Sequence, residues 1–447
     1  MSHRLVPLIA LALLSCKGGD HEHENAPPPQ PNATEPGPST TKLASPDPAL
    51  RARAKELANK YIIVDGHIDV PYRLGASKND KGEITEDISK RTEKGDFDYP
   101  RARAGGLDAP FMSIYVPAKY QKDGGAKKFA DSLIDMVMSF EKKWPDKFKI
   151  ARSPAEVRSN FGKGLISLPM GMENGAPIGD DLKNIAYFYE RGIRYITLTH
   201  SKDNLISDSS YDTSATWKGL SPFGRKVVEE MNRVGIMIDI SHVSDNSFYQ
   251  VLDITKVPVI ASHSSARQFT VDFERNMSDE MIEAIKENGG VVMINFGSTF
   301  INDESRRYFD RQRNAMMAYA WKKKIPRDDP KMKEFVKEWV KGNPPKFATV
   351  KDVADHIDRV VKFAGVDHVG FGSDFDGVGD SLPVGLKDVS QYPNLIAELL
   401  ARGYSETDIE KMASGNLLRV WAAVENHAKK GFNTPGPKGP VPEVRTD

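Results

Sequence analysis

Ile62-Ile63-Val64-Asp65-Gly66-His67-Ile68-Asp69 begins as an apolar, β-branched run and ends in side chains that can bind a metal or move a proton. Runs of this length and composition predict β-strands. Seven more follow along the chain: Phe111–Val116, Gly164–Leu168, Tyr195–Leu198, Ile236–Ile240, Val257–Ile260, Val291–Asn295 and Val369–Phe371. Most of these lead to a residue of the same chemical kind, namely Glu173, His200, His242, His263 or Asp374.

Segments of helical period lie between the predicted strands. They are Lys127–Lys142, Asp180–Arg191, Gly224–Val234, Asp245–Leu252, Asp279–Asn288 and Val350–Phe363. Strands that alternate with helices indicate a parallel sheet with right-handed crossovers. An open doubly wound sheet would carry a glycine-rich phosphate loop after its first strand, where this chain has Gly66-His67-Ile68-Asp69. The pattern therefore predicts a closed (β/α)8 TIM barrel, whose active site lies at the carboxyl ends of its strands.

One long segment interrupts this alternation. Asn302–Pro345 follows the seventh predicted strand, is strongly charged and is predicted to be helical. Its place in the chain puts it on the catalytic face of the barrel. A lid, a contact in a homodimer and an insertion without catalytic role all fit the sequence equally well.

The charge balance excludes some partners. The chain of 447 residues has 62 basic and 62 acidic side chains, so its net charge offers no general attraction to nucleic acid. We therefore expect a small-molecule substrate and no nucleic-acid partner. Beyond the N-terminus no apolar stretch approaches the length of a membrane-spanning helix. Residues 49–432 are predicted to form one catalytic domain, and residues 433–447 a loose C-terminal tail.

The N-terminus has the features of an export signal. Residues 1–15 combine a short basic start with an apolar stretch, which predicts a signal peptide. Leu13-Leu14-Ser15-Cys16 resembles a bacterial lipobox, in which the thiol of Cys16 would be lipidated. Residues 16–48 are predicted to form a disordered tether. This predicts a lipoprotein of the bacterial cell envelope, attached to the membrane through its lipid anchor only. An ordinary secretory signal with an incidental cysteine is the alternative.

Five residues at the strand ends predict a metal centre. His67 and Asp69 are two positions apart on a strand end, so they point to the same side. In a barrel they converge with Glu173, His242 and His263. Three imidazoles and two carboxylates suit zinc or another borderline divalent ion. One catalytic zinc usually takes three protein ligands, so two ions that share a carboxylate fit this set better.

These residues lie in motifs that resemble the membrane (renal) dipeptidase family of zinc metallopeptidases, in the amidohydrolase superfamily. The resemblance covers roughly Ala54 to Val424. The motifs are Val64-Asp65-Gly66-His67-Ile68-Asp69, Gly171-Met172-Glu173-Asn174, Leu198-Thr199-His200 with Asn204, Asp239-Ile240-Ser241-His242, Ser262-His263-Ser264, Arg275-Asn276, Gly370-Phe371-Gly372-Ser373-Asp374-Phe375-Asp376-Gly377 and Gly415-Asn416-Leu417-Leu418-Arg419-Val420.

The resemblance implies a binuclear zinc dipeptidase that hydrolyses dipeptides by attack of a metal-bridging hydroxide. It implies His67 and Asp69 on one Zn²⁺ ion, His242 and His263 on the other, and Glu173 bridging the two. It also implies a catalytic role for two residues and substrate binding by a third: His200 faces the scissile carbonyl, Asp374 the attacking water, and Arg275 the terminal carboxylate of the substrate. Dimers are common in the family, so a homodimer is possible.

Two departures from the family concern the substrate. Vertebrate members have a tyrosine where this chain has Phe300, which removes one hydrogen bond to the substrate carboxylate. The segment Asn302–Pro345 is much shorter in them. One alternative is another binuclear-metal amidohydrolase that acts on a cyclic amide, a lactone, a phosphotriester or a β-lactam. A second alternative is a lipid-anchored binding protein on a decayed enzyme fold. His356, in mid-helix, is predicted to be a packing or surface residue.

Overall fold

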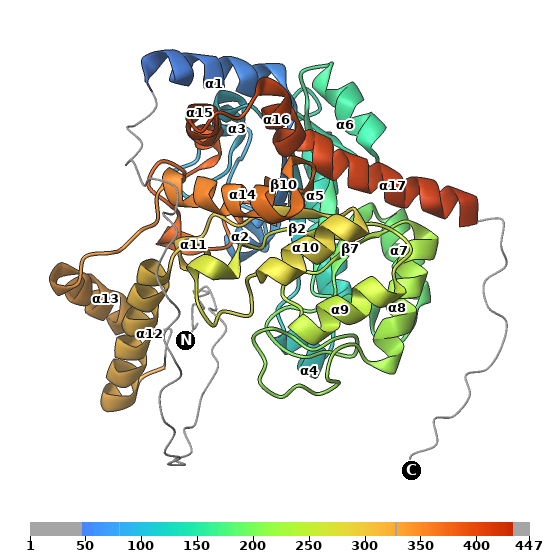
Figure 1. Ribbon diagram of the computed structural model, residues 1–447. Coiled ribbons are helices and arrows are strands. Elements are labelled where there is room, and N and C mark those ends of the chain that lie inside the picture. Colours follow the sequence, from blue (N-terminus) through green and yellow to red (C-terminus); the bar gives the residue numbers. More distant parts are fainter. Residues whose placement is uncertain (1–46, 80, 327–328, 432–447) are drawn as a thin grey trace, which may run out of the picture.

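Eight parallel strands close into a barrel in the computed structural model, which describes residues 47–79, 81–326 and 329–431 (Figure 1). Around the barrel the strands are ordered β1-β10-β9-β8-β7-β6-β5-β2. Their bounds are β1 (Ile63–Ile68), β2 (Leu107–Tyr115), β5 (Met170–Glu173), β6 (Ile193–Thr197), β7 (Met237–Asp239), β8 (Ile260–Ala261), β9 (Val291–Ile294) and β10 (Val369–Phe371). The first strand pairs with both β2 and β10, which closes the sheet. The prediction of a (β/α)8 barrel is confirmed.

The predicted third barrel strand, Gly164–Leu168, is wrong. Its residues form β4 (Ile166–Leu168), which pairs with β3 (Phe148–Ile150) in a separate two-stranded sheet. Pro169, which has no backbone N–H to donate, separates β4 from β5. The strand that pairs with β2 and carries Glu173 is therefore β5.

Helices cover the outside of the barrel (Figure 1). Their bounds are α1 (Pro48–Lys60), α2 (Val70–Ala76), α3 (Tyr99–Gly105), α4 (Lys119–Asp123), α5 (Ala126–Lys143), α6 (Pro154–Phe161), α7 (Lys183–Glu190), α8 (Pro222–Val234), α9 (Asp245–Ile254), α10 (Asp279–Asn288), α11 (Ser298–Ile301), α12 (Asp303–Lys323), α13 (Pro330–Gly342), α14 (Val350–Ala364), α15 (Tyr392–Ala401), α16 (Glu406–Glu410) and α17 (Asn416–Gly431). Local sequence sets several starts: the Ser244 and Ser278 side chains accept hydrogen bonds from the third residues of α9 and α10.

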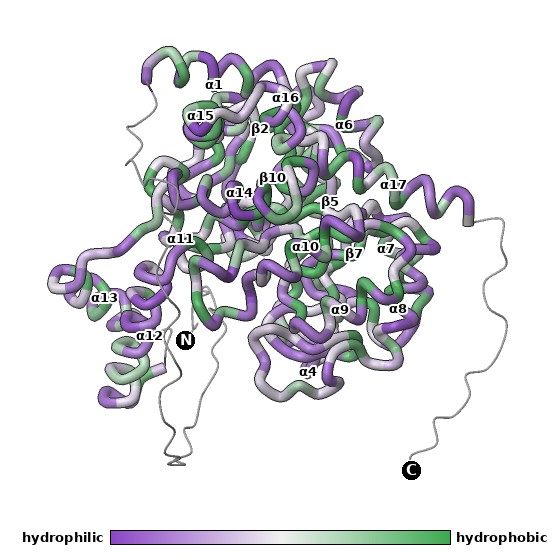
Figure 2. Tube along the Cα trace, in the orientation of Figure 1, coloured by the Kyte–Doolittle hydropathy of each residue, from purple (hydrophilic) through white to green (hydrophobic). Residues whose placement is uncertain are grey.

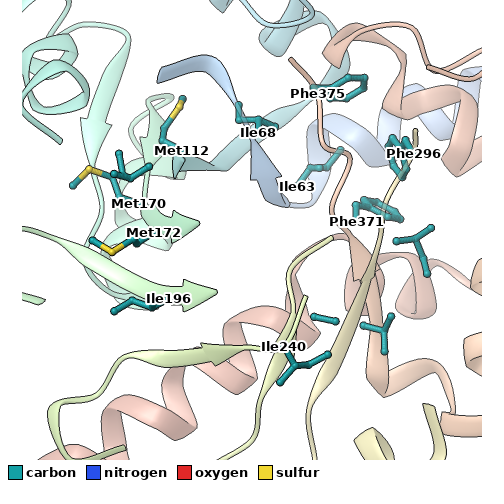
Figure 3. Close-up of a cluster of buried hydrophobic side chains, with 14 of the residues drawn as sticks. Ile63, Ile68, Met112, Met170, Met172, Ile196, Ile240, Phe296, Phe371 and Phe375 are labelled. Atoms are coloured by element: carbon teal, nitrogen blue, oxygen red, sulfur yellow. The ribbon is translucent and has the colours of Figure 1, made fainter. Parts of the chain in front are cut away.

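Hydrophobic residues form two layers, one on each side of the strands. In β1, Ile63 packs in the layer between barrel and helices, whereas its neighbour Val64 belongs to the second cluster, because successive side chains of a strand point to opposite faces. Figure 3 shows part of the layer between barrel and helices. Figure 2 shows the hydropathy of each residue along the chain. In the second cluster Trp421 of α17 packs 5.3 Å from the ring of Phe111.

The predicted insertion after the seventh barrel strand consists of two helices. α12 and α13 project from the body of the domain as a helical hairpin (Figure 1). Within the residues that the structure describes, no helix combines the length and the apolar character needed to cross a membrane.

Candidate active site

The predicted metal ligands converge at the carboxyl ends of the barrel strands. His67 lies in β1 and Glu173 is the last residue of β5, whereas His242 and His263 follow β7 and β8. Ligand atoms of these residues, together with Asp69, His200 and Asp374, form groups in which the atoms lie within 4.8 Å of one another. The folded barrel thus brings together residues that are more than 300 positions apart in the sequence.

Glu173 lies at the centre of this cluster. Its Oε2 atom is 3.5 Å from Nε2 of His67, which in turn lies 3.4 Å from Oδ2 of Asp69. Its Oε1 atom is 3.1 Å from Nε2 of His242 and 3.4 Å from Nε2 of His263. The two oxygens of one carboxylate therefore face two different sets of ligands.

Some polar atoms of the cluster are buried without a hydrogen-bond partner, and a bound cation would supply one. His67 Nε2 and Asp69 Oδ1 are buried and have no hydrogen-bond partner in the described part of the chain. The Nε2 atoms of His242 and His263 lie only 2.9 Å apart. Buried polar atoms without partners are costly unless a ligand satisfies them. Imidazole nitrogens and carboxylate oxygens are the donors that borderline divalent metals prefer, so the site fits a metal.

The electrostatics of the ligands favour the same conclusion. Burial, together with the positive charge of Arg275, lowers the pKa of His242 well below its ordinary value. Burial, His67 and Arg275 do the same for His263. Burial opposes ionisation of Glu173, but the charges of His67 and His200 and the hydrogen bonds from His242 and His263 outweigh it and lower the pKa of Glu173 well below its ordinary value. Neutral imidazoles and an ionised carboxylate are the forms that bind metal, and these shifts favour them at His242, His263 and Glu173. At His67 burial opposes protonation, but Tyr195, Glu173 and Asp69 raise its pKa well above the ordinary value, so a metal would displace a proton there.

A second layer of hydrogen bonds orients two of the imidazoles. Ser262 Oγ donates to Asp239 Oδ2 at 2.6 Å and lies 2.7 Å from Nδ1 of His263. Because the hydroxyl proton goes to Asp239, Nδ1 of His263 must donate, which leaves the lone pair of Nε2 facing the cluster. The second imidazole is that of His67, whose Nδ1 atom lies 2.8 Å from the hydroxyl of Tyr195.

Asp65 ties the first and last strands together beneath the site. Its Oδ1 atom accepts hydrogen bonds from the backbone N–H groups of His67 at 2.9 Å and Ser373 at 3.0 Å. The hydroxyl of Tyr392 donates to its other oxygen. Burial raises the pKa of Asp65 to about 6. Asp65 therefore fixes the backbone of one predicted ligand and of the residue that precedes Asp374.

Asp374 is held in a tight turn after β10. Its φ is 62°, a left-handed conformation that non-glycine residues rarely adopt. Asn295 Nδ2 donates to its Oδ2 atom at 2.8 Å. A Cβ atom on Gly377 would lie 2.1 Å from Oδ1 of Asp374 and 2.3 Å from Oδ2 of Asp69, so only glycine leaves both carboxylates in place. Burial raises the pKa of Asp374 to about 7, and a nearby divalent cation would favour the ionised form.

His242 and Asn174 share this left-handed conformation, with φ values of 69° and 82°. Asn174 directly follows β5, whereas His242 and Asp374 each lie three residues after the last residue of a barrel strand, β7 and β10. Strained backbone of this kind persists where the surrounding structure imposes it, and it is concentrated at functional sites. The backbone geometry therefore marks the same end of the barrel as the side chains do.

Arg275 lies beside the cluster and is 3% exposed. Its Nη1 atom donates to Ser264 Oγ at 2.7 Å and its Nη2 atom to the carbonyl oxygen of His263 at 2.8 Å. Its Nε atom is buried without a hydrogen-bond partner in the described residues. The guanidinium lies 5.4 Å from the ring of Phe300, which has no hydroxyl to contribute to this part of the site.

His200 is the most exposed histidine of the cluster, with 17% of its side chain accessible. Its ring lies 4.3 Å from that of His242 and 4.7 Å from that of Tyr115, and its Nε2 atom is 3.4 Å from Oε1 of Glu173. Burial lowers the pKa of His200. Its place at the edge of the metal cluster leaves it accessible to a bound molecule.

Other predictions lie outside the cluster. His356 is a packing residue, as expected, because it accepts a hydrogen bond from the N–H of Ala266 and lies 2.7 Å from the carbonyl oxygen of Ile301. Burial lowers its pKa to about 4. Cys16 and the signal peptide lie outside the described residues. The supporting roles of Asp65, Tyr195 and Asp239 were not predicted, although two of these residues stand inside the quoted motifs.

Comparison with known proteins identifies the family. The sequence profile of the family described as membrane dipeptidase (peptidase family M19) matches residues 51–434. The chain therefore belongs to the membrane dipeptidase family. It is a metallo-dipeptidase, a metal-dependent hydrolase that acts on peptide bonds.

Solved structures of related proteins share the fold over most of this chain. The probable dipeptidase PvdM from Pseudomonas aeruginosa is 28% identical, with a TM-score of 0.71 over 85% of this chain and 99% of that one. A metallopeptidase from Rhodobacter sphaeroides, solved with a phosphinate mimic of the dipeptide L-Ala-D-Ala, is 26% identical, with a TM-score of 0.64 over 81% of this chain and 99% of that one. The dipeptidase AC is also 26% identical, with a TM-score of 0.64 over 81% of this chain and 98% of that one.

Proposed function

We propose that this metallo-dipeptidase uses two zinc ions, bridged by Glu173. The observation that carries the proposal is that the two oxygens of the Glu173 carboxylate face different groups of predicted ligands. Oε2 faces His67, which lies against Asp69, and Oε1 faces His242 and His263. One ion would be held by the first pair of residues and the other by the second pair.

When bound, the zinc ions would supply hydroxide at neutral pH and polarise the scissile carbonyl. The protein side chains perform the remaining tasks. Asp374 accepts one proton of the attacking water and returns it to the departing nitrogen, while the hydroxyl stays on the carbonyl carbon; cleavage of the C–N bond then leaves a carboxyl group on one amino acid and an amine on the other. The hydrogen bond from Asn295 Nδ2 to the Oδ2 atom of Asp374 holds the carboxylate in place for this proton transfer.

His200 and Arg275 would position the substrate. His200, at the accessible edge of the cluster, donates to the oxygen of the scissile carbonyl as negative charge develops on it. Arg275 binds the terminal carboxylate of the dipeptide, because its buried guanidinium has donor capacity that the described residues leave unused. The distance between these two groups would then restrict cleavage to the bond next to the C-terminal residue.

The substrate we propose is a small dipeptide with a free carboxylate. The Rhodobacter sphaeroides metallopeptidase binds a phosphinate mimic of L-Ala-D-Ala, and its likeness to this chain at 26% identity supports a substrate of the same class. Two aromatic side chains lie beside the cluster: the ring of Tyr211 is 5.8 Å from that of His242 and 6.0 Å from that of Phe273.

Metal analysis tests the binuclear centre directly. We expect the purified chain to contain two zinc ions, and Glu173→Gln to lose at least one of them because the amide cannot bridge two cations. Glu398→Gln is a matched control, since Glu398 is equally buried but pairs with Arg402 outside the site. Elemental analysis after dialysis, combined with a dipeptide hydrolysis assay, measures both properties. One ion per chain in the fully active protein would contradict the proposal.

We also propose that the chain is a lipoprotein of the bacterial cell envelope, anchored through Cys16. The lipobox-like sequence Leu13-Leu14-Ser15-Cys16 supports this, and lipidation requires the thiol. Cys16→Ser should therefore abolish incorporation of radiolabelled fatty acid into the protein while dipeptide hydrolysis continues. Fractionation of the producing cells provides a second readout. Undiminished labelling of the serine variant would exclude this anchor.

A further inference from the structure

The α12–α13 hairpin is fixed at its base to the rim of the active site. Arg306 Nη2 donates to the carbonyl oxygen of Val271 at 3.0 Å, in the loop that leads to Arg275. Within the hairpin, the hydroxyl of Tyr308 in α12 donates to the carbonyl oxygen of Asn343, the residue that follows α13, at 3.0 Å. From this base α12 extends for about 30 Å, at 1.5 Å per residue over its length (Figure 1). The hairpin is thus a long projection with an anchored base.

The two helices pack on each other through aromatic side chains. The rings of Tyr319 and Phe335 stack at 4.4 Å, and those of Tyr308 and Trp339 lie 5.5 Å apart. This packing leaves Trp321 outside, with 87% of the residue exposed, more than any other large hydrophobic residue in the described ranges. Met317, four residues earlier and therefore on the same face of α12, is 39% exposed.

Charge is distributed unevenly along the hairpin. Near the base, Arg306 and Arg307 form ion pairs with Asp303, and Arg313 pairs with Asp310. The distal part carries six exposed lysines and, among the residues described there, only the acidic side chains of Asp329 and Glu334. The lysines are Lys322, Lys323, Lys324, Lys331, Lys333 and Lys337, and none of them forms an ion pair within the described chain. The chain as a whole has a net charge of zero.

We propose that the distal end of the hairpin, residues 314–326 and 329–337, docks onto an anionic lipid surface. Clusters of four to eight basic residues bind acidic headgroups, and each lysine near such a surface contributes about 1 kcal/mol. Tryptophan favours the interface between headgroups and acyl chains, which accounts for an exposed Trp321 next to three consecutive lysines. The proposal depends neither on the zinc centre nor on the lipid anchor at Cys16.

Vesicle binding by the full-length chain tests this surface. All proteins carry Cys16→Ser, so that no attached lipid contributes and the N-termini are identical. On phosphatidylcholine vesicles that contain phosphatidylglycerol, Lys322→Gln/Lys323→Gln/Lys324→Gln should weaken partitioning about 100-fold, because the loss of three lysines corresponds to about 3 kcal/mol. Trp321→Ala should weaken it about tenfold, through the loss of apolar area buried in the interface.

The matched control removes three positive charges from exposed lysines outside the hairpin. Lys55, Lys142 and Lys163 are also exposed, and their triple replacement by glutamine should leave partitioning close to the parent value. On pure phosphatidylcholine the parent and the hairpin triple variant should bind equally. The proposal is overturned if both triple variants bind phosphatidylglycerol vesicles equally. It is also overturned if the hairpin variants change only the molar mass measured by light scattering, which would make the hairpin a contact between protomers. Unchanged dipeptide hydrolysis would show that each variant is folded.

Discussion

Asp374→Asn should lower kcat for dipeptide hydrolysis by roughly 10²–10⁴-fold, the usual effect of removing a general acid–base group. The substitution preserves shape, and the amide oxygen of the new side chain can still accept the hydrogen bond from Asn295. It removes only the ability to take a proton from water and return it to the leaving amine. Steady-state kinetics on a dipeptide, with zinc content measured on the same preparation, provides the readout.

The alternatives to this role give different results. A raised KM with an unchanged kcat would reassign Asp374 to substrate binding. Loss of zinc in parallel with activity would make it a metal ligand, which its proximity to His67 and Asp69 makes a necessary check. Asp376→Asn is the matched control, because Asp376 is buried in the same turn but pairs with Arg73. Its replacement should lower thermal stability and leave the chemical step intact.

The sequence predicted the barrel and the metal cluster because both depend on one simple relation. In a parallel barrel the carboxyl ends of all strands meet, so chemically active residues that follow apolar runs must converge. His67, Glu173, His242 and His263 obey this relation, and the structure places their ligand atoms together. The assignment required no knowledge of strand order, since closure of the barrel brings every strand end to the same face.

The incorrect prediction of the third barrel strand shows that an apolar run does not by itself identify a strand of the barrel. Residues 164–168 have the apolar character of a barrel strand, but they pair with β3 outside the barrel. The true barrel strand, β5, contains two methionines and a glycine and lacks β-branched residues. Its place is set by pairing with β6, the next strand, and with β2, from which α5, α6 and the β3–β4 sheet separate it along the chain. Amino-acid composition does not reveal which strands pair. The sequence therefore predicted Glu173 as a ligand but assigned it to the wrong strand.

The residues that support the ligands were harder to predict for a related reason. Asp239 orients His263 through Ser262, and Asp65 joins the backbone of β1 to that of Ser373. Each of these contacts crosses from one strand to another, and a buried aspartate in a strand could equally be a ligand, a cap or a structural group. Only the register of the barrel distinguishes these roles. His356 was predicted correctly as a packing residue because it lies in the middle of a helical segment and not at the end of a strand.

Arg275→Met should lower kcat/KM for a dipeptide by roughly 30- to 3,000-fold. Truncating one partner of a desolvated, hydrogen-bonded charge pair costs about 2–5 kcal/mol, and each 1.4 kcal/mol corresponds to a factor of ten. The corresponding dipeptide amide has no carboxylate to bind, so it should be a poor substrate already and should lose little more. Phe300, beside Arg275, has no hydroxyl that could donate a hydrogen bond to the substrate carboxylate. We therefore expect binding of the carboxylate to depend strongly on Arg275.

Arg267→Met separates binding from support of the fold. Arg267 lies in the same segment, but both of its Nη atoms donate to Asp245, away from the metal cluster. Its replacement should change kcat/KM for the dipeptide and for the dipeptide amide by the same factor.

Arg275 also donates hydrogen bonds to Ser264 and to the carbonyl oxygen of His263, so the effect of its loss must be compared on both substrates. Equal losses for Arg275→Met would mean that the guanidinium supports the His263 loop and that the terminal carboxylate binds elsewhere. A loss confined to the dipeptide would place the carboxylate on Arg275 and define the enzyme as an exopeptidase.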